Sequence, residues 1–195
     1  MPDQPTEPNR RRFLGATAAL AAGTLAPRTV LAQGTRLAPT PECKPSRATP
    51  AQTEGPFYSP RTPMKASFRA DANGAPIVLE GRVLAPDCTP LAGAWLDFWH
   101  ADSDGHYDNT GFRLRGHQVA DAQGHYKLET ILPALYPGRA RHIHVKVRAK
   151  EGGRILTTQT YFPDDPGNAR DSLYRAELVA KRSGDTLRFD FVLAA

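Results

Sequence analysis

Short apolar segments that alternate with polar residues recur along the chain, separated by turn-forming residues. An alternation with a period of two residues is typical of β-strands that place one face in a core. We expect turns at residues 86–93 and 121–124, and helical periodicity is confined to a stretch near residues 171–180. We expect strands over residues 77–84, 94–99, 125–130, 141–147, 155–162 and 186–193. Several short strands joined by regular turns predict an all-β fold, a β-sandwich of mostly antiparallel strands.

The N-terminal region differs from the rest of the chain. Arg10-Arg11-Arg12-Phe13-Leu14-Gly15 matches a twin-arginine export signal, and an apolar run over residues 16–26 follows it. The small residue Ala32 suits cleavage before Gln33, and a run of about ten apolar residues is too short to cross a bilayer. An amphipathic N-terminal helix is the alternative. We therefore expect no membrane span and a periplasmic or secreted location.

Three parts follow from this organisation. We expect a signal peptide over residues 1–32, an extended arm rich in Pro, Thr and Ser over residues 33–49, and one β-sandwich domain over residues 50–195. The composition is 40% hydrophobic and 23% charged, as in globular proteins, and 195 residues suit one domain. The net charge of +5 contains +2 from the first 32 residues, and the remainder has no dense block of Lys and Arg. We therefore expect no nucleic-acid partner.

The chain has two cysteines, Cys43 and Cys88. In an oxidising periplasm they are expected to form one disulfide between the arm and the first hairpin, and two unpaired thiols are the alternative. Neither belongs to a Cys-x-x-Cys unit, which argues against a thiolate metal site.

One expected strand carries a pair of histidines. In Arg141-His142-Ile143-His144-Val145-Lys146-Val147, side chains two residues apart point to the same face. His142 and His144 therefore project together, while Ile143, Val145 and Val147 project to the opposite, core-compatible face. Two neutral imidazoles fixed on one side of a strand provide half of a metal site, although such pairs also occur in ordinary strands.

Further motifs surround this pair. Trp99-His100-Ala101-Asp102-Ser103-Asp104-Gly105-His106-Tyr107 and Leu135-Tyr136-Pro137-Gly138-Arg139 precede it, and Thr158-Gln159-Thr160-Tyr161-Phe162 follows it. Thr53-Glu54-Gly55-Pro56-Phe57-Tyr58 lies upstream. In this order the motifs resemble the intradiol ring-cleavage dioxygenases, such as protocatechuate 3,4-dioxygenase and catechol 1,2-dioxygenase. The resemblance spans roughly residues 50–166.

The resemblance implies a non-haem iron(III) enzyme with Tyr107, Tyr136, His142 and His144 as metal ligands. Phenolate oxygen is a hard anionic donor, so two tyrosines also favour Fe³⁺ over Cu(I) or Zn(II) on chemical grounds. The implied reaction uses O2 to cleave a catechol-type ring between its two hydroxyls, giving a muconate-type diacid. Small-molecule catechol and O2 are thus the expected partners, and we leave open whether the protein forms a homo-oligomer.

The resemblance also implies catalytic residues. Tyr136 would leave the metal and accept a catechol proton, and Arg139 would stabilise negative charge on the ring. Gln159 would orient an oxygen intermediate. The alternatives are a surface arginine in a basic turn for Arg139 and a solvent-facing strand residue for Gln159. We interpret His100, His106, His117 and His125 mostly as surface residues.

The sequence departs from the family in two places. The segment over residues 33–50 is too short for the helical dimerisation region of the well-known catechol dioxygenases, and only five residues separate Tyr136 from His142. Such a short loop predicts a shallower, more open site, and the sequence does not rank free catechol, protocatechuate or lignin-derived catechols. The alternative function is a catalytically silent exported β-sandwich module that binds a metal or another ligand.

Overall fold

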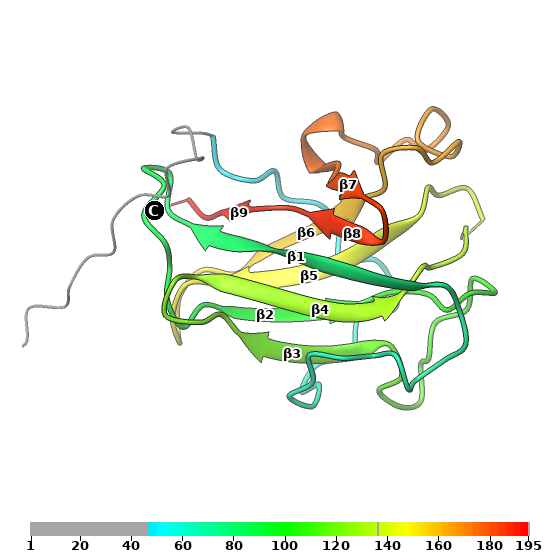
Figure 1. Cartoon of the computed structure of the whole chain (residues 1–195), viewed down its shortest axis with the longest axis horizontal. Coiled ribbons are helices and arrows are strands. Elements are labelled where there is room, and N and C mark those ends of the chain that lie inside the picture. Colours follow the sequence, from blue (N-terminus) through cyan, green and yellow to red (C-terminus); the bar gives the residue numbers. More distant parts are fainter. Residues whose placement is uncertain (1–46, 136, 195) are drawn as a thin grey trace, which may run out of the picture. The chain divides into compact units, whose positions relative to one another are not determined.

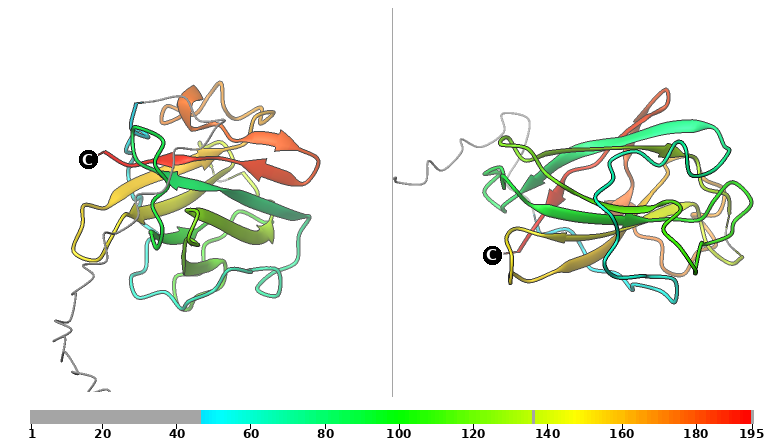
Figure 2. Two further views of the ribbon diagram at one scale, coloured as in Figure 1. Left: turned by 60° about the vertical axis from the view of Figure 1, so that its left-hand side comes forward. Right: turned by 90° about the horizontal axis from the view of Figure 1, so that it is seen from below.

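Nine strands form two sheets in the part of the chain that the computed structural model describes, residues 47–135 and 137–194. One sheet has the order β3-β2-β5-β6, and the other has the order β4-β1-β8-β7 with β9 also paired to β1 (Figure 1). The strands are β1 Pro76–Leu84, β2 Trp95–Trp99, β3 Arg115–Val119, β4 His125–Ile131, β5 His142–Arg148, β6 Leu156–Tyr161, β7 Lys181–Ser183, β8 Thr186–Arg188 and β9 Phe191–Val192. The sheets lie face to face (Figure 2), which confirms the all-β sandwich.

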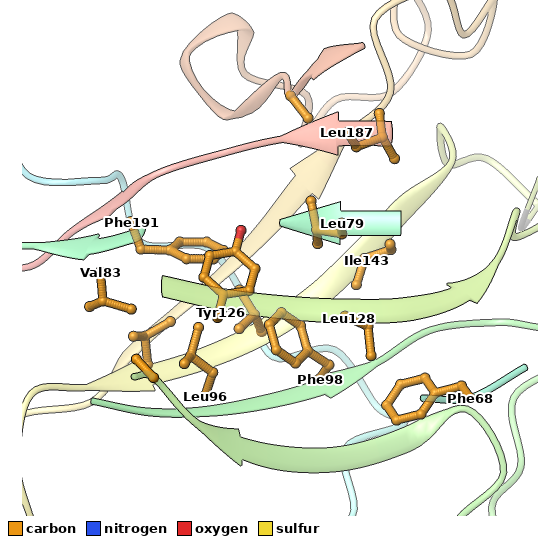
Figure 3. Close-up of a cluster of buried hydrophobic side chains, with 14 of the residues drawn as sticks. Phe68, Leu79, Val83, Leu96, Phe98, Tyr126, Leu128, Ile143, Leu187 and Phe191 are labelled. Carbon is orange, nitrogen blue, oxygen red and sulfur yellow. The ribbon is translucent and has the colours of Figure 1, made fainter. Parts of the chain in front are cut away.

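A hydrophobic core joins the facing sides of the two sheets. Each of its strands alternates buried apolar residues with residues that point away from the core, as the period-two pattern predicts. Figure 3 shows aromatic rings and aliphatic chains from both sheets in contact. Core members include Leu79 and Val83 of β1, Leu96 and Phe98 of β2, Tyr126 and Leu128 of β4, Ile143, Val145 and Val147 of β5, and Leu187 and Phe191.

The expected strand over residues 186–193 is interrupted. β8 pairs with the first half of β1 and β9 with its end, both in parallel, and the chain between them bulges at Phe189-Asp190. The Asp190 carboxylate accepts the Arg82 N–H at 2.8 Å, and the Phe189 carbonyl accepts the Tyr126 hydroxyl at 2.7 Å. These two contacts replace ladder hydrogen bonds, so one strand becomes two.

Two strands, β3 and β7, were not expected from the sequence, and the expected helical stretch was wrong. β3 was not expected because its sequence, Arg-Gly-His-Gln-Val, places no alternating apolar residues toward the core. β7 was not expected because all three of its residues are exposed. The stretch 171–180 contains only the 3-10 turn η1, Ala176–Leu178. The Asp171 side chain accepts the Leu173 N–H at 2.8 Å, which is a turn contact and not a helical one.

Several expectations lie outside the described residues. These are the signal peptide, most of the extended arm, Tyr136, and Cys43 as the disulfide partner. Cys88 itself is buried and disulfide-bonded. Within the described part of the chain, no helix is long and apolar enough to cross a membrane.

Candidate metal centre

The register of the four-stranded sheet brings the candidate donors to one outward face. His144 pairs with Trp99 of β2 on one side and with Gln159 of β6 on the other, and His142 pairs with Tyr161. Directly paired residues of antiparallel strands point to the same side of a sheet. These side chains therefore form neighbouring rows on the face opposite the hydrophobic core.

This outward face is covered by the chain that precedes β1. We call residues 50–62 the covering segment. It is attached to β6 by the Gln52 N–H, which donates to the Thr157 carbonyl at 2.8 Å, and by the Thr158 hydroxyl, which donates to the Pro50 carbonyl at 2.7 Å. Because of this cover, His142 and His144 are only 4% and 3% exposed. The donors thus lie in a second, polar interior outside the sandwich core.

The described donor atoms converge. The Nε2 atoms of His142 and His144 are 3.1 Å apart, and the Tyr107 hydroxyl lies 3.3 Å from His142 Nε2. His142 Nδ1 lies 2.6 Å from the Ala140 carbonyl. A carbonyl only accepts, so Nδ1 carries the proton and Nε2 presents its lone pair toward the other two donors.

Burial keeps both imidazoles neutral. Desolvation, with the Arg139 cation nearby, lowers the pKa of His142 from 6.5 to about 4. Desolvation, together with the neighbouring His142 and Arg139, lowers the pKa of His144 well below 6.5. A neutral imidazole is the form that binds a metal, so the environment favours the ligand state of both residues at pH 7.

Tyr107 is positioned by its neighbours in the loop after β2. Its ring stacks on Phe57 of the covering segment, with centroids 4.5 Å apart and planes 16° apart. The buried Arg115 links the two segments, since its Nε donates to the Asp108 carbonyl at 2.7 Å and its Nη1 donates to the Phe57 carbonyl. Arg115 was not singled out from the sequence, where it is one of many arginines.

The covering segment also contacts His144. A side chain at Gly55 would begin 3.6 Å from His144 Cε1, and Gly55 has φ +70°, which favours glycine. Trp99 also stacks on this imidazole, with ring centroids 4.7 Å apart and planes 7° apart. Tyr58 packs on Trp99 at 4.8 Å and donates to the Asp97 carboxylate at 3.0 Å.

Asp97 anchors the covering segment to the sheet. It is fully buried and also accepts the Thr62 hydroxyl at 2.7 Å. Burial raises the pKa of Asp97, and the hydrogen bonds from Thr62 and Tyr58 oppose that rise. From the sequence, Asp97 was recognised only as part of an expected strand. Its role as an anchor was not predicted, because its hydrogen-bond partners lie 35 and 39 residues away in the chain.

Arg139 and Gln159 meet beside the donors. Arg139 Nη2 donates to Gln159 Oε1 at 2.6 Å, and Gln159 Nε2 donates to the Thr53 carbonyl at 3.2 Å. The Arg139 side chain is 17% exposed and Gln159 is fully buried. Arg139 is therefore not a surface arginine, and Gln159 is not a solvent-facing strand residue. Tyr136, the fourth candidate ligand, lies outside the described residues.

The interpretation of the remaining histidines as surface residues was wrong for His100. It is 1% exposed and lies between the Ala101 carbonyl and the Thr130 hydroxyl, each at 2.7 Å from a ring nitrogen. His106 and His125 are exposed, and His117 is half-buried. A cavity of about 1000 Å³ lies over the other sheet, and none of its lining residues is a candidate donor.

The donor atoms present fit a hard metal ion. Two nitrogen ligands at about 2.1 Å from one ion and at right angles lie about 3 Å apart, close to the separation of the two Nε2 atoms. Among the described residues, no group of three or more His, Cys, Asp and Glu side chains could hold a metal. The Tyr107 oxygen lies beside the two histidine nitrogens, and phenolate oxygen is a hard donor that favours a trivalent ion.

The fold and the site define a β-sandwich that gathers tyrosine and histidine donors on the outer face of one sheet. The sequence matches a family model described as Dioxygenase over residues 53–194. The chain belongs to the intradiol dioxygenase family. The recognition made from the motifs is thereby confirmed.

Relatives and solved structures agree with this family. The hydroxyquinol 1,2-dioxygenase of Rhizobium sp. strain MTP-10005 is 32% identical, and the match covers 67% of this chain and 53% of that protein. The catechol 1,2-dioxygenase of Acinetobacter baylyi is 33% identical over 65% of this chain and 50% of its own length. The chain thus spans about half the length of the curated relatives it matches.

One solved structure matches over almost its whole length. It is the dioxygenase domain of a dioxygenase carbohydrate-binding protein fusion from Streptomyces sp. SirexAA-E. It is 45% identical, with a TM-score of 0.72, and the match covers 76% of this chain and 99% of that one.

Proposed function

We propose that the protein is a non-haem iron(III) intradiol dioxygenase that uses O2 to cleave catechol-type aromatic diols between their hydroxyls, giving muconate-type diacids. The observation that carries the proposal is the convergence of Tyr107, His142 and His144 on one point of a covered sheet face. Tyr136 is proposed as the fourth ligand from its place in the motif. The names of the relatives, catechol and hydroxyquinol dioxygenases, support the substrate class.

Tyr107, His142 and His144, with Tyr136, would hold a ferric ion, which would supply Lewis-acid binding of the diol and activation of its ring toward O2. The protein supplies the rest. His142 and His144 stay neutral and fixed, because burial lowers their pKa values and the Ala140 carbonyl holds the His142 ring. The covering segment limits water around them, which strengthens electrostatic interactions in the site.

Arg139 is proposed to stabilise negative charge that develops on the bound ring. Its guanidinium is held by Asp171 at 2.9 Å and by Gln159 at 2.6 Å, so it needs no rearrangement during the reaction. Gln159 is proposed to act in the site with one amide end held by Thr53 and the other by Arg139. Tyr136 is proposed to act as the base that accepts one catechol proton.

The proposal is tested by colour and by turnover. Protein supplied with Fe³⁺ should show a phenolate-to-iron absorption band in the visible range. Adding catechol should consume O2 and produce the ultraviolet absorption of a muconate. A coloured protein that consumes no O2 with any catechol would instead be a silent metal-binding module. Protein that stays colourless after reconstitution with iron would contradict the metal assignment.

Tyr107→Phe provides the residue-level test. It should lose much of the absorption band and of the bound iron, because phenylalanine lacks the donor oxygen. Tyr126→Phe is the control, since Tyr126 is buried in the sandwich core and its hydroxyl donates to the Phe189 carbonyl, away from the candidate donors. If Tyr107→Phe stays coloured and active, the ligand assignment is wrong.

We also propose that the protein is exported by the twin-arginine route. The support is the motif at residues 10–15 and the apolar run that follows it. Replacing Arg10 and Arg11 by lysine should retain the protein in the cytoplasm, measured by cell fractionation. Equal periplasmic amounts of both proteins would refute this proposal.

A further inference from the structure

Two buried aspartates, Asp165 and Asp171, lie in the segment that follows β6. The Asp165 and Asp171 side chains are 1% and 0% exposed. Each accepts a backbone N–H two residues further on, from Gly167 at 2.6 Å and from Leu173 at 2.8 Å. Each is also paired with one arginine of the loop between Tyr136 and β5. The two carboxylates thus have matched local surroundings.

Asp171 holds Arg139. Its carboxylate accepts Arg139 Nε at 3.0 and 2.9 Å and the backbone N–H of Ala140 at 3.0 Å. That N–H belongs to the peptide that joins Arg139 to Ala140. Asp171 therefore fixes both the side chain and the following peptide of Arg139, whose Nη2 then reaches Gln159 Oε1. A carboxylate at the Nε edge aims the rest of the planar guanidinium.

Asp165 holds the next peptide. Its carboxylate accepts the Arg141 backbone N–H at 3.2 Å and Arg141 Nη1 at 2.9 Å. The peptide that joins Ala140 to Arg141 also carries the carbonyl that accepts the proton of His142 Nδ1 at 2.6 Å. A peptide group is planar, so fixing its N–H also fixes its C=O. Asp165 therefore orients the His142 imidazole indirectly, through the peptide group that joins Ala140 to Arg141.

We propose that Asp165 and Asp171 are positioning residues with separate effects on the site. Asp165 fixes the carbonyl that selects the His142 tautomer, and Asp171 fixes the guanidinium of Arg139. The inference rests on the proposed function for its catalytic part, because Arg139 is assigned there to the substrate. Its metal-binding part concerns only the residues around His142.

The experiment compares Asp165→Asn with Asp171→Asn in the full protein. An asparagine amide presents N–H₂ where one carboxylate oxygen accepted, so each variant leaves at least one donor without an acceptor. Because the two sites are matched in burial and in donors, we expect similar decreases in the urea midpoint of unfolding. A purely structural role would affect iron binding and turnover alike in the two variants.

We expect the two variants to lose different functions, iron affinity in one and turnover in the other. Asp165→Asn should lower the apparent iron affinity, measured by competition with a chelator, by about 10–100-fold, while turnover per bound iron is retained. Asp171→Asn should retain iron affinity and the visible band, while kcat for catechol per bound iron falls by about 10–100-fold. Equal losses in both variants, or the reverse pattern, would overturn the proposal.

A third measurement needs no turnover. The NMR chemical shifts of the two ring nitrogens of His142, measured in metal-free protein, report which nitrogen carries the proton. The wild type and Asp171→Asn should show Nδ1–H, and Asp165→Asn should show a mixture of tautomers. An unchanged tautomer in Asp165→Asn overturns the role of Asp165 whether or not the protein cleaves catechols. A wild type that binds iron and turns over no catechol would refute the proposed function and the role of Asp171 in turnover, and leave the Asp165 result standing.

Discussion

The buried His100 gives a quantitative prediction about stability in acid. Its Nδ1 faces the Ala101 carbonyl, so this nitrogen carries the proton and Nε2 accepts the Thr130 hydroxyl. Burial lowers the pKa of His100 from 6.5 to about 4. The folded protein therefore takes up this proton at much lower pH than the unfolded chain does.

The sign and size follow from linkage between protonation and folding. A histidine whose pKa is lowered by folding contributes stability that is fully present above the unfolded pKa of 6.5 and is lost as pH falls toward 4. Each tenfold change in proton affinity is worth about 1.4 kcal/mol, so the full contribution is about 3 kcal/mol. Roughly 2 kcal/mol of this should be lost between pH 7 and pH 5.

The assay is urea unfolding of the wild type and His100→Gln at pH 7 and pH 5. The decrease in unfolding free energy between these pH values should be about 2 kcal/mol smaller in the variant. Contributions of the other buried histidines occur in both proteins and cancel in the comparison. His106→Gln is the control, because the exposed His106 side chain should leave the wild-type decrease unchanged. Equal decreases in the wild type and His100→Gln would refute the reasoning.

Three further substitutions test the covering segment and the core. Asp97→Asn should lower the unfolding free energy in urea by about 1–3 kcal/mol, because one of the two hydroxyl donors loses its acceptor. Burial raises the pKa of Asp97, so the stability that this carboxyl contributes is present at low pH and is lost as pH rises through the pKa of the folded state. The difference in unfolding free energy between the wild type and Asp97→Asn should therefore be larger at pH 4 than at pH 8. A larger difference at pH 8 would contradict this reasoning. Gly55→Ala should cost about 1–2 kcal/mol through its positive φ, while iron content is retained because the new Cβ makes only van der Waals contact with His144. Phe98→Ala, in the fully buried core, should cost about 3–5 kcal/mol, and thermal unfolding with an unchanged midpoint would show that this ring is not part of the packing.

The histidine pair and its strand could be predicted because the information is local. Successive residues along one strand alternate between its faces, and Ile143, Val145 and Val147 are indeed in the core. The same reasoning predicted β1, β2, β4 and β6 within a few residues. It failed for β3, whose inward positions are Gly116 and Gln118 and carry no apolar signal.

The partners of the site could not be predicted because they come from distant parts of the chain. Asp97 is joined to the covering segment, and Arg115 to Phe57, across more than thirty intervening residues. A buried aspartate has the same local pattern as an exposed one. The burial of His100 could not be predicted either, because its polar partner Thr130 lies on β4 of the other sheet.

The placement of the donors on the outward face of β5 has a consequence for how such proteins diversify. The inward residues of this strand maintain the sandwich, and the outward residues hold the chemistry, so the two sets can change independently. New donor types at residues 142 and 144 would leave the apolar residues that pack between the sheets unchanged. The scaffold is therefore suited to laboratory evolution of the donor set, with fold stability screened separately from reactivity.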